Sequence, residues 1–199
     1  MIKSSFLAWI LRMPLIQRWA VMHLIKPENV AEHSHQVAVI AHLLATIRNT
    51  YCGGSISPEK AATVALYHEV SETKLQDVIH VTKYHNPAIT KEFKAIEELT
   101  ERECLKTLPA ELQPIFNELL IQKNVDPEYK KIVKAADMIS AYLKACDEIK
   151  FLNPEFNAVK QRLEEKINKL RTELPEVEIF MEMFAERCLV NIEDMPTEF

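Results

Sequence analysis

Glycine is nearly absent from this sequence. The 199 residues contain only 2 glycines, which are adjacent at Gly53 and Gly54. Phosphate-binding loops of the P-loop and dinucleotide-binding types need several glycines at fixed spacing, so this chain can build neither of them. The shortage of glycine also favours helices, because helix interiors tolerate glycine poorly.

Two further absences narrow the class of protein. The formal net charge is -5 and no basic stripe is present, so the chain lacks the surface that a nucleic acid polymer requires. The 4 cysteines form no CxxC pair, which excludes a zinc ribbon and argues against a disulfide scaffold. We interpret Cys52, Cys104, Cys146 and Cys188 as free thiols in a reducing compartment.

Long hydrophobic runs are missing as well. The N-terminal run FLAWIL is too short for a signal segment and meets Arg12 at once. No stretch reaches the roughly 18 uninterrupted apolar residues of a membrane-spanning helix. We therefore expect a soluble, cytoplasmic protein without a membrane partner. With 48% hydrophobic residues, the chain is long enough for a single well-buried domain over residues 1–199.

The apolar residues that are present recur at helical spacing between prolines, which predicts an all-α fold. Asn29 and Glu32 form a capping-box-like start for a helix that ends near residue 49. Asp126 before Pro127 opens another long helix. The other predicted helices cover residues 4–12, a turn around Arg18 and Trp19, 57–73, 87–109, a shorter stretch to about 122, 154–171 and 175–189. We expect a loop over residues 74–86 and an irregular tail after Asn191.

Polar side chains interrupt the apolar faces of three of these segments. They are His33 in the first long helix, His68 and Glu69 in the helix over 57–73, and Asp137 in the second long helix. Burying an unpaired carboxylate or imidazole costs roughly 2–7 kcal/mol, so each group needs a partner. One shared divalent cation would satisfy all four.

Each residue alone has a simpler explanation. A core histidine often hydrogen-bonds a backbone carbonyl, and Asp137 could pair with Lys134 or Lys144. The combination favours a metal, because two imidazoles and two carboxylates suit manganese, cobalt, iron or zinc better than calcium or magnesium. Four protein ligands leave positions open for water and a phosphate oxygen, which is typical of a metal-dependent hydrolase.

The sequence around these positions resembles a known family. An all-α chain with a histidine, a histidine-acid pair and a distant aspartate is similar to the HD-domain phosphohydrolases. The runs QRWAVMHLIKPENVAEHSHQVAVIAH, ALYHEVSE and KAADMISAYLKACDE, with a QD loop ending in KY, resemble the bacterial 5'-deoxynucleotidases of the HD superfamily over nearly the whole chain. The resemblance implies one HD-type helical bundle, with metal-binding helices within about 29–145 and C-terminal helices at 154–189 packed on them.

The resemblance also implies an activity and a set of site residues. Such enzymes remove the 5'-phosphate from deoxyribonucleoside 5'-monophosphates with one divalent metal ion, and they are dimeric. By position, the metal ligands would be His33, His68, Glu69 and Asp137. The catalytic residues would be Glu72, which handles the proton, and Arg18, which orients the phosphate. Substrate contacts would come from Arg18, Trp19, His33, Glu69, Asp77 and Asp137.

The residues themselves leave alternatives open for these roles. Glu72 lies four positions after His68, so one helix would carry both side chains on the same side, but a solvated glutamate at a helix end has the same pattern. Arg18 beside Trp19 is also an ordinary surface stack. Asp77 could accept a hydrogen bond from a sugar 3'-hydroxyl. Trp19 could crowd out a 2'-hydroxyl, by roughly 10²-fold at most.

This chain departs from the family at two places. The family's histidine-aspartate pair is His68-Glu69 here, and the extra methylene moves the carboxylate by about 1.5 Å where metal bonds tolerate about 0.2 Å. Gln76 stands where the family has glycine, and Val78 to Thr82 replace a proline-rich turn. Two interpretations follow: a working metal-dependent nucleotidase, or a nucleotide-binding or regulatory protein on the same scaffold with weakened metal binding. His80 and His85 are predicted to be solvated rather than ligands.

Overall fold

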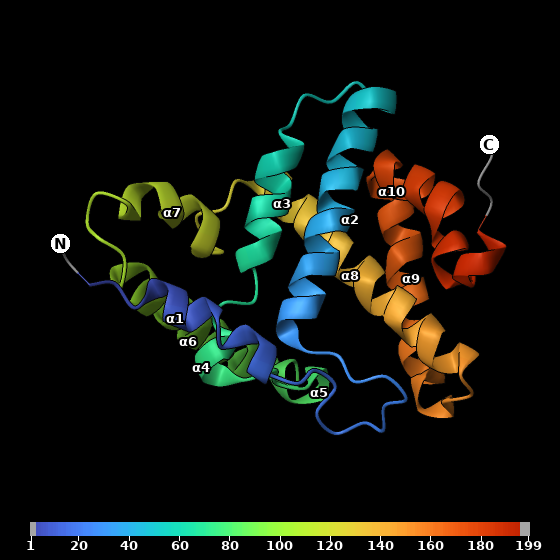
Figure 1. Cartoon of the computed structure of the whole chain (residues 1–199), viewed down its shortest axis with the longest axis horizontal. Coiled ribbons are helices and arrows are strands. Elements are labelled where there is room, and N and C mark those ends of the chain that lie inside the picture. The colour runs from blue at the N-terminus through green and yellow to red at the C-terminus, as the bar shows by residue number, and fades with distance from the viewer. Residues whose placement is uncertain (1–2, 196–199) are drawn as a thin grey trace.

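The computed structural model describes residues 3–195, and in this range its regular structure is helical apart from one isolated bridge (Figure 1). This confirms the all-α prediction. The α-helices are α1 (Phe6–Ile10), α2 (Val30–Tyr51), α3 (Pro58–Tyr67), α4 (Glu72–Leu75), α5 (His80–Lys83), α6 (Pro87–Lys106), α7 (Gln113–Leu120), α8 (Pro127–Lys150), α9 (Asn157–Glu173) and α10 (Pro175–Phe180). Short 3-10 or π turns follow at Met13–Leu15, Pro154–Phe156, Met181–Ala185, Arg187–Leu189 and Ile192–Asp194.

The long helices α2 and α8 cross at the centre of the bundle, with α3 beside α2 (Figure 1). Both begin as the sequence predicts. Asn29 and Glu32 form a complete capping box, and the Asp126 side chain accepts a hydrogen bond from the Glu128 backbone N–H. Their apolar faces pack together in the main core, in which Leu44 and Ile139 are fully buried.

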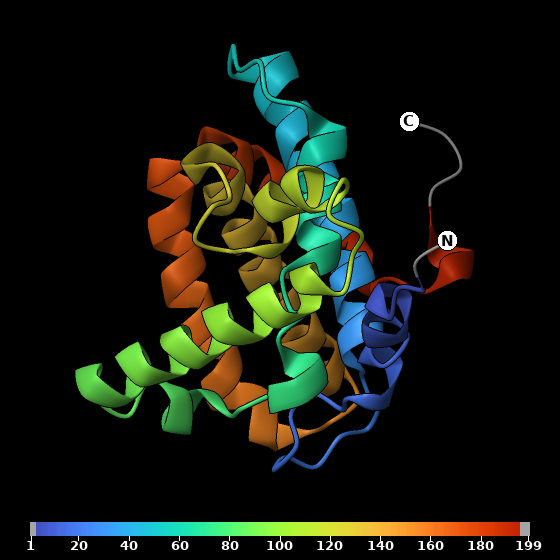
Figure 2. The same cartoon turned by 90° about the vertical axis from the view of Figure 1, so that its left-hand side faces the viewer.

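The remaining helices cover the two sides of this centre. Helices α9 and α10 pack against α8 and α2, while α1, α6 and α7 form the opposite side (Figure 1). Figure 2 shows α6 crossing that side, with α4 and α5 alongside it. A second, smaller core lies there and includes Val70, Cys104 and Leu120. Val70, in the turns that follow α3, packs into this second core.

The predicted unbroken helix over 57–73 is wrong. Helix α3 ends at Tyr67, tight turns follow, and α4 starts at Glu72. Here the Ala65 carbonyl oxygen accepts from the His68 backbone N–H at 3.4 Å, and the His68 Nδ1 atom lies 2.6 Å from the same oxygen. In a continuous helix that oxygen accepts from the Glu69 N–H, so the imidazole competes with the backbone for it.

Other local predictions also need correction. No helical turn surrounds Arg18 and Trp19, because the chain there runs antiparallel to residues 28–30 through a bridge between Gln17 and Asn29. The predicted loop over 74–86 contains one helical turn, α5. The predicted helix over 175–189 is divided into α10, a π turn and a 3-10 turn. The tail contains one 3-10 turn, and its end lies outside the described residues.

Two predictions made from absences can be compared with the structure. The thiols of Cys52, Cys104, Cys146 and Cys188 are all free, as predicted. Among residues 3–195, no helix combines the length and the apolar character needed to cross a lipid bilayer.

Candidate metal centre

Four side chains from three elements meet where α2, the end of α3 and α8 come together. His33 comes from α2, His68 and Glu69 from the end of α3, and Asp137 from α8. Each offers one metal-binding atom, and these atoms all lie within 4.8 Å of one another. The structure thus brings together the four residues that the sequence predicts as ligands.

His33 is fully buried, and both of its ring nitrogens lie close to polar atoms. Its Nε2 atom lies 3.0 Å from Asp137 Oδ1, and its Nδ1 atom lies 3.3 Å from Ser140 Oγ. The Ser140 hydroxyl donates its proton to Gln36 Oε1, so its oxygen is free to accept from Nδ1–H. Burial, followed by the nearby charge of Arg18, lowers the pKa of His33 to about 3. This ring is therefore neutral, as a metal-binding imidazole must be.

His68 presents an unpaired nitrogen to the same group. Its Nδ1 atom must donate to the Ala65 carbonyl, which can only accept, so Nε2 carries a lone pair. This Nε2 atom is buried, has no hydrogen-bond partner, and lies 3.4 Å from Glu69 Oε1. Two electron-rich atoms at this separation are stabilised by a cation between them. The donor set and this orphaned nitrogen both fit a divalent metal.

The two carboxylates reach the group despite the longer side chain of Glu69. Glu69 lies in the tight turn after α3 rather than inside a regular helix, and its carboxylate is within the four-atom cluster. Asp137 pairs with His33 and not with Lys134 or Lys144, so that simpler explanation is wrong. With its proton on Nδ1, His33 cannot donate from Nε2 to Asp137 Oδ1, so these two electron-rich atoms 3.0 Å apart are also stabilised by a cation between them.

Glu72 lies directly beside this cluster. Its Oε2 atom is buried and has no hydrogen-bond partner. Burial and the neighbouring carboxylates of Glu69 and Asp77 raise the pKa of Glu72 well above its ordinary value. Glu72 is therefore not a solvated glutamate at a helix end.

Arg18 does stack on Trp19, with its Cζ atom 5.4 Å from the ring centroid, but the Arg18 side chain is largely buried and carboxylates hold both residues. Arg18 Nη1 donates to Glu28 Oε2 at 3.0 Å, and Trp19 Nε1 donates to the same oxygen at 2.9 Å. The Trp19 backbone N–H donates to Asp77 Oδ2 at 3.2 Å. The positive charge of Arg18 also acts to lower the pKa of His33, of Glu72 and of Asp137.

Two histidines lie outside the metal cluster, and two residues that hold its members or the neighbouring Arg18 were not identified from the sequence. His80 and His85 are exposed and do not belong to it, as predicted. Sequence reasoning missed Glu28, because no helical spacing relates it to Arg18 in an irregular segment ten residues earlier. It also gave no role to Ser140, although its position three residues after Asp137 on one helix was a usable signal.

The fold is that of the HD-domain phosphohydrolases. An HD-domain phosphohydrolase from Listeria innocua superimposes with a TM-score of 0.81 at 22% identity, covering 94% of this chain and 90% of that one. The HD phosphohydrolase DatZ of cyanophage S-2L, whose structure holds dA and one catalytic Zn²⁺ ion, superimposes with a TM-score of 0.67 at 21% identity. That match covers 95% of this chain and 98% of DatZ.

Within this class the chain belongs to the YfbR-like 5'-deoxynucleotidase family, whose sequence profile matches residues 5–188. A 5'-deoxynucleotidase of Vibrio parahaemolyticus, VP0926, is 42% identical over 193 residues, which are 97% of this chain and 98% of the relative. The 5'-deoxynucleotidase YfbR of Escherichia coli O127:H6 is 39% identical over 97% of this chain and 96% of the relative. Membership confirms the predicted family and supports an enzyme rather than a regulatory protein.

Proposed function

We propose that this protein removes the 5'-phosphate from deoxyribonucleoside 5'-monophosphates, as one HD-type domain that binds a single divalent metal ion. The observation that carries the proposal is the unpaired, buried Nε2 atom of His68 inside a cluster of four metal-binding groups. The two relatives described above, which match nearly the whole chain, are both named as 5'-deoxynucleotidases. The proposed ligands are His33, His68, Glu69 and Asp137.

The metal is proposed to be cobalt, manganese or a similar ion, because the cluster mixes nitrogen and oxygen donors. The Zn²⁺ ion in DatZ shows that an HD phosphohydrolase can also use zinc. When bound, the ion supplies Lewis-acid polarisation of a phosphoryl oxygen and activation of a water molecule. The chain's own contribution is to fix the two imidazoles in the tautomers described above and to bring the two carboxylates to the same point.

Glu72 is proposed to move the proton in this reaction. Its free Oε2 atom is buried next to Glu69, so no bulk water competes for it. From this position it can exchange a proton with the attacking water or the departing 5'-oxygen. A Glu72→Gln variant is therefore expected to bind the metal normally and to lose turnover.

Arg18 and Trp19 are proposed to bind the two ends of the substrate. The planar guanidinium group of Arg18 is proposed to form paired hydrogen bonds with the dianionic phosphate. His33, Glu69 and Asp137 are proposed to contact the substrate as well. Trp19 is proposed to lie beside the nucleoside, where it crowds a 2'-hydroxyl. Asp77 binds the Trp19 backbone through one oxygen, which leaves the other for a sugar 3'-hydroxyl.

Phosphate release from matched deoxyribo- and ribonucleoside 5'-monophosphates, measured with several divalent metals, tests the proposal. We expect release from the deoxynucleotides only when metal is present, with ribonucleotides slower by up to about 10²-fold. Metal-independent release, or equal release from both sugars, would count against it.

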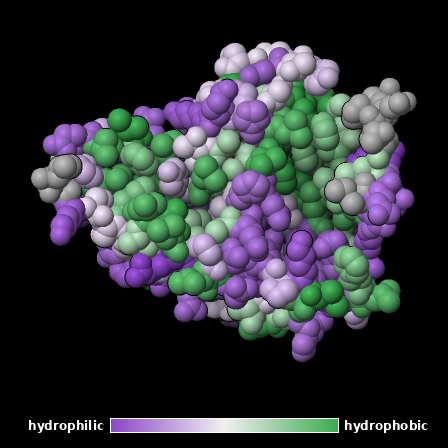
Figure 3. Space-filling model, in the orientation of Figure 1, coloured by the Kyte–Doolittle hydropathy of each residue, from purple (hydrophilic) through white to green (hydrophobic). Residues whose placement is uncertain are grey.

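We further propose that the protein is a cytoplasmic homodimer. Large apolar side chains are exposed along α1 and the segment after it, with Leu7 62%, Leu11 66% and Leu15 77% exposed. Figure 3 shows hydrophobic residues gathered over α1 on one face of the molecule. Light scattering on a sized sample is expected to give twice the mass of the 23.0 kDa chain. A Leu11→Glu variant is expected to shift that mass toward the monomer.

A further inference from the structure

Glu28 is a buried carboxylate outside the metal cluster that contacts two of the proposed substrate-binding residues, Arg18 and Trp19. Its residue surface is only 4% exposed. A single oxygen, Oε2, accepts from Arg18 Nη1 and from Trp19 Nε1. Hydrogen bonds that involve a charged group are about twice as strong as neutral ones, so this oxygen fixes both side chains firmly.

The backbone around Glu28 places Arg18 directly opposite it. The Arg18 N–H donates to the Glu28 carbonyl at 3.0 Å, and the Val30 N–H donates to the Ile16 carbonyl at 2.9 Å. Trp19 follows with a φ of 62°, in the left-handed region that a bulky residue rarely adopts. Such a conformation persists only when its surroundings hold it, and here the Glu28 carboxylate and the Phe156 ring contact the indole.

Glu28 is itself held by contacts to α8. The preceding residues Ile25 and Lys26 donate their backbone N–H groups to Glu148, which is 1% exposed. Lys144 donates both to the Lys26 carbonyl and to Glu148. Because α8 also carries Asp137, the segment that ends in Glu28 is fixed to the same helix as the metal cluster.

We propose that Glu28 is a positioning residue that sets Arg18 and Trp19 for the substrate, so that phosphate orientation and sugar selection depend on one carboxylate. The inference rests on the proposed function. Arg18 is proposed to orient the phosphate, and a displacement of about 1 Å in a group with that role can lower the rate by about 10²-fold. Glu28 touches neither metal ligand nor substrate in this account and acts only through its two partners.

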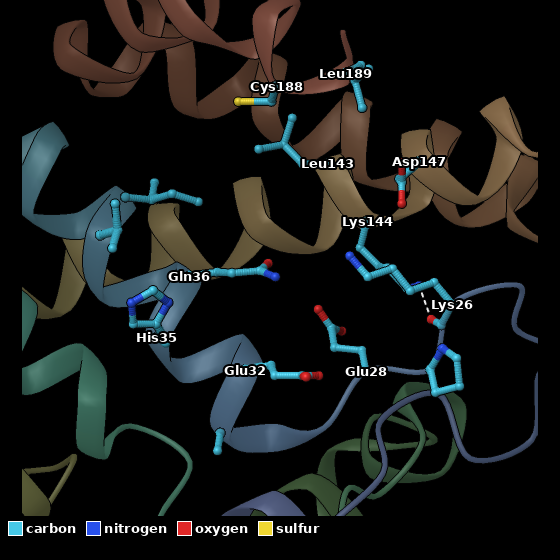
Figure 4. A pocket seen from close by; sticks show the side chains of 14 residues that line it. Lys26, Glu28, Glu32, His35, Gln36, Leu143, Lys144, Asp147, Cys188 and Leu189 are labelled. Atoms are coloured by element: carbon cyan, nitrogen blue, oxygen red, sulfur yellow. Dashed lines mark hydrogen bonds between the residues drawn. The ribbon is translucent and has the colours of Figure 1, made fainter. Parts of the chain in front are cut away.

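A cavity beside Glu28 allows the inference to be tested by chemical rescue. The cavity has a volume of about 810 Å³, and its lining includes Glu28, Gln36, Val39 and Leu143. Figure 4 shows the Glu28 carboxylate directed into it. Removing the side chain therefore leaves a space that a small carboxylate such as formate can enter.

The primary test is a Glu28→Gln variant, which keeps the size of the side chain and an acceptor oxygen but loses the charge. We expect kcat/KM for dAMP to fall by about 10- to 100-fold and the preference for deoxyribose to weaken. In Glu28→Ala, formate is expected to restore part of the lost activity. Glu32→Gln is the matched control, because Glu32 lines the same cavity without touching Arg18 or Trp19, and it should retain wild-type kcat/KM.

A double-mutant cycle separates positioning from a general structural role. In an Arg18→Ala background, Glu28→Gln is expected to cause less than about a 3-fold further loss in kcat/KM, because Arg18 is gone and only the contact of Glu28 with Trp19 remains. An undiminished 10- to 100-fold loss in that background, or no loss in the wild-type background, overturns the inference. A wild-type protein without phosphate release would instead refute the proposed function.

A measurement made without substrate distinguishes failure of the positioning role from failure of the proposed function. The chain has 2 tryptophans, so Trp19 is the only one in a Trp9→Phe background. We expect Glu28→Gln to lower the fluorescence anisotropy of Trp19, because its indole N–H loses a charged partner. Unchanged anisotropy and emission would contradict the positioning role, whatever the activity of the enzyme.

Discussion

The imidazole of His68 donates to the carbonyl oxygen of Ala65, three residues earlier, at 2.6 Å. This contact takes the oxygen that would continue the helix, so α3 ends at Tyr67. It also fixes the proton on Nδ1 and leaves the lone pair of Nε2 facing Glu69 and the rest of the cluster. One hydrogen bond therefore both stops the helix and orients a proposed metal ligand.

His33 is oriented by a side chain instead of a carbonyl, which gives a prediction for Ser140. In Ser140→Ala, the Nδ1–H of His33 loses its acceptor, and we expect metal affinity to fall by about 10- to 100-fold. Isothermal titration of metal-free protein with Co²⁺ measures this. Ser34→Ala is the control, since Ser34 is also buried on α2 but its hydroxyl has no partner. Equal affinities for the two variants would show that Ser140 does not orient His33.

The glutamate at position 69 gives a second prediction. Its carboxylate already reaches the cluster from the turn after α3, so shortening it should withdraw a ligand atom by about 1.5 Å. We expect Glu69→Asp to bind Mn²⁺ at least about tenfold more weakly and to release phosphate more slowly. Equally tight Mn²⁺ binding together with faster phosphate release in Glu69→Asp would contradict this. It would show that the longer side chain of Glu69 lowers activity despite the turn after α3.

Gln76 gives a prediction about stability. Its φ of 63° and ψ of 171° lie in a region that is essentially restricted to glycine. We expect Gln76→Gly to raise the free energy of unfolding by about 1 kcal/mol, because relieved strain exceeds the added flexibility of the unfolded chain. Urea unfolding measures this, with Gln76→Ala as a control that keeps a Cβ atom. A destabilised glycine variant would refute the assignment of strain.

Glu148 gives a pH prediction. Burial opposes its charge, but hydrogen bonds from Lys144, Asn153 and two backbone N–H groups lower its pKa from 4.5 to about 2. The folded form therefore binds the proton less readily than the unfolded form. The resulting stabilisation of roughly 3 kcal/mol is complete above pH 4.5 and is lost as the pH falls toward about 2.

Urea unfolding at several pH values tests this linkage. Glu148→Gln is expected to be less stable than wild type at pH 7, with a difference that shrinks steadily below pH 4.5. The exposed Glu164, which pairs only with Lys160 on the same helix, provides the control variant Glu164→Gln. A wild-type to Glu148→Gln difference that does not change with pH would contradict the account.

The sequence was informative where local signals act within one helix. The capping box at Asn29 and the apolar stripe that contains His33 predicted α2 and its inward face. Polar side chains on apolar faces then marked the four ligand candidates, and the resemblance implied the same set. The sequence did not predict the contacts that depend on side-chain geometry or on segments far apart in the chain. The break at His68 depends on a side chain bonding a carbonyl, and the role of Glu28 depends on an antiparallel pairing between two irregular segments, which no periodicity encodes.

Phosphate release from dAMP, followed while Co²⁺ is titrated into metal-free protein, tests the central claim most directly, with bound metal counted at each point. The account predicts that activity rises in proportion to bound metal and reaches its maximum at one ion per chain, and that His68→Ala shows neither binding nor release. Full activity in metal-free protein, or one tightly bound ion with no release of phosphate, would contradict it.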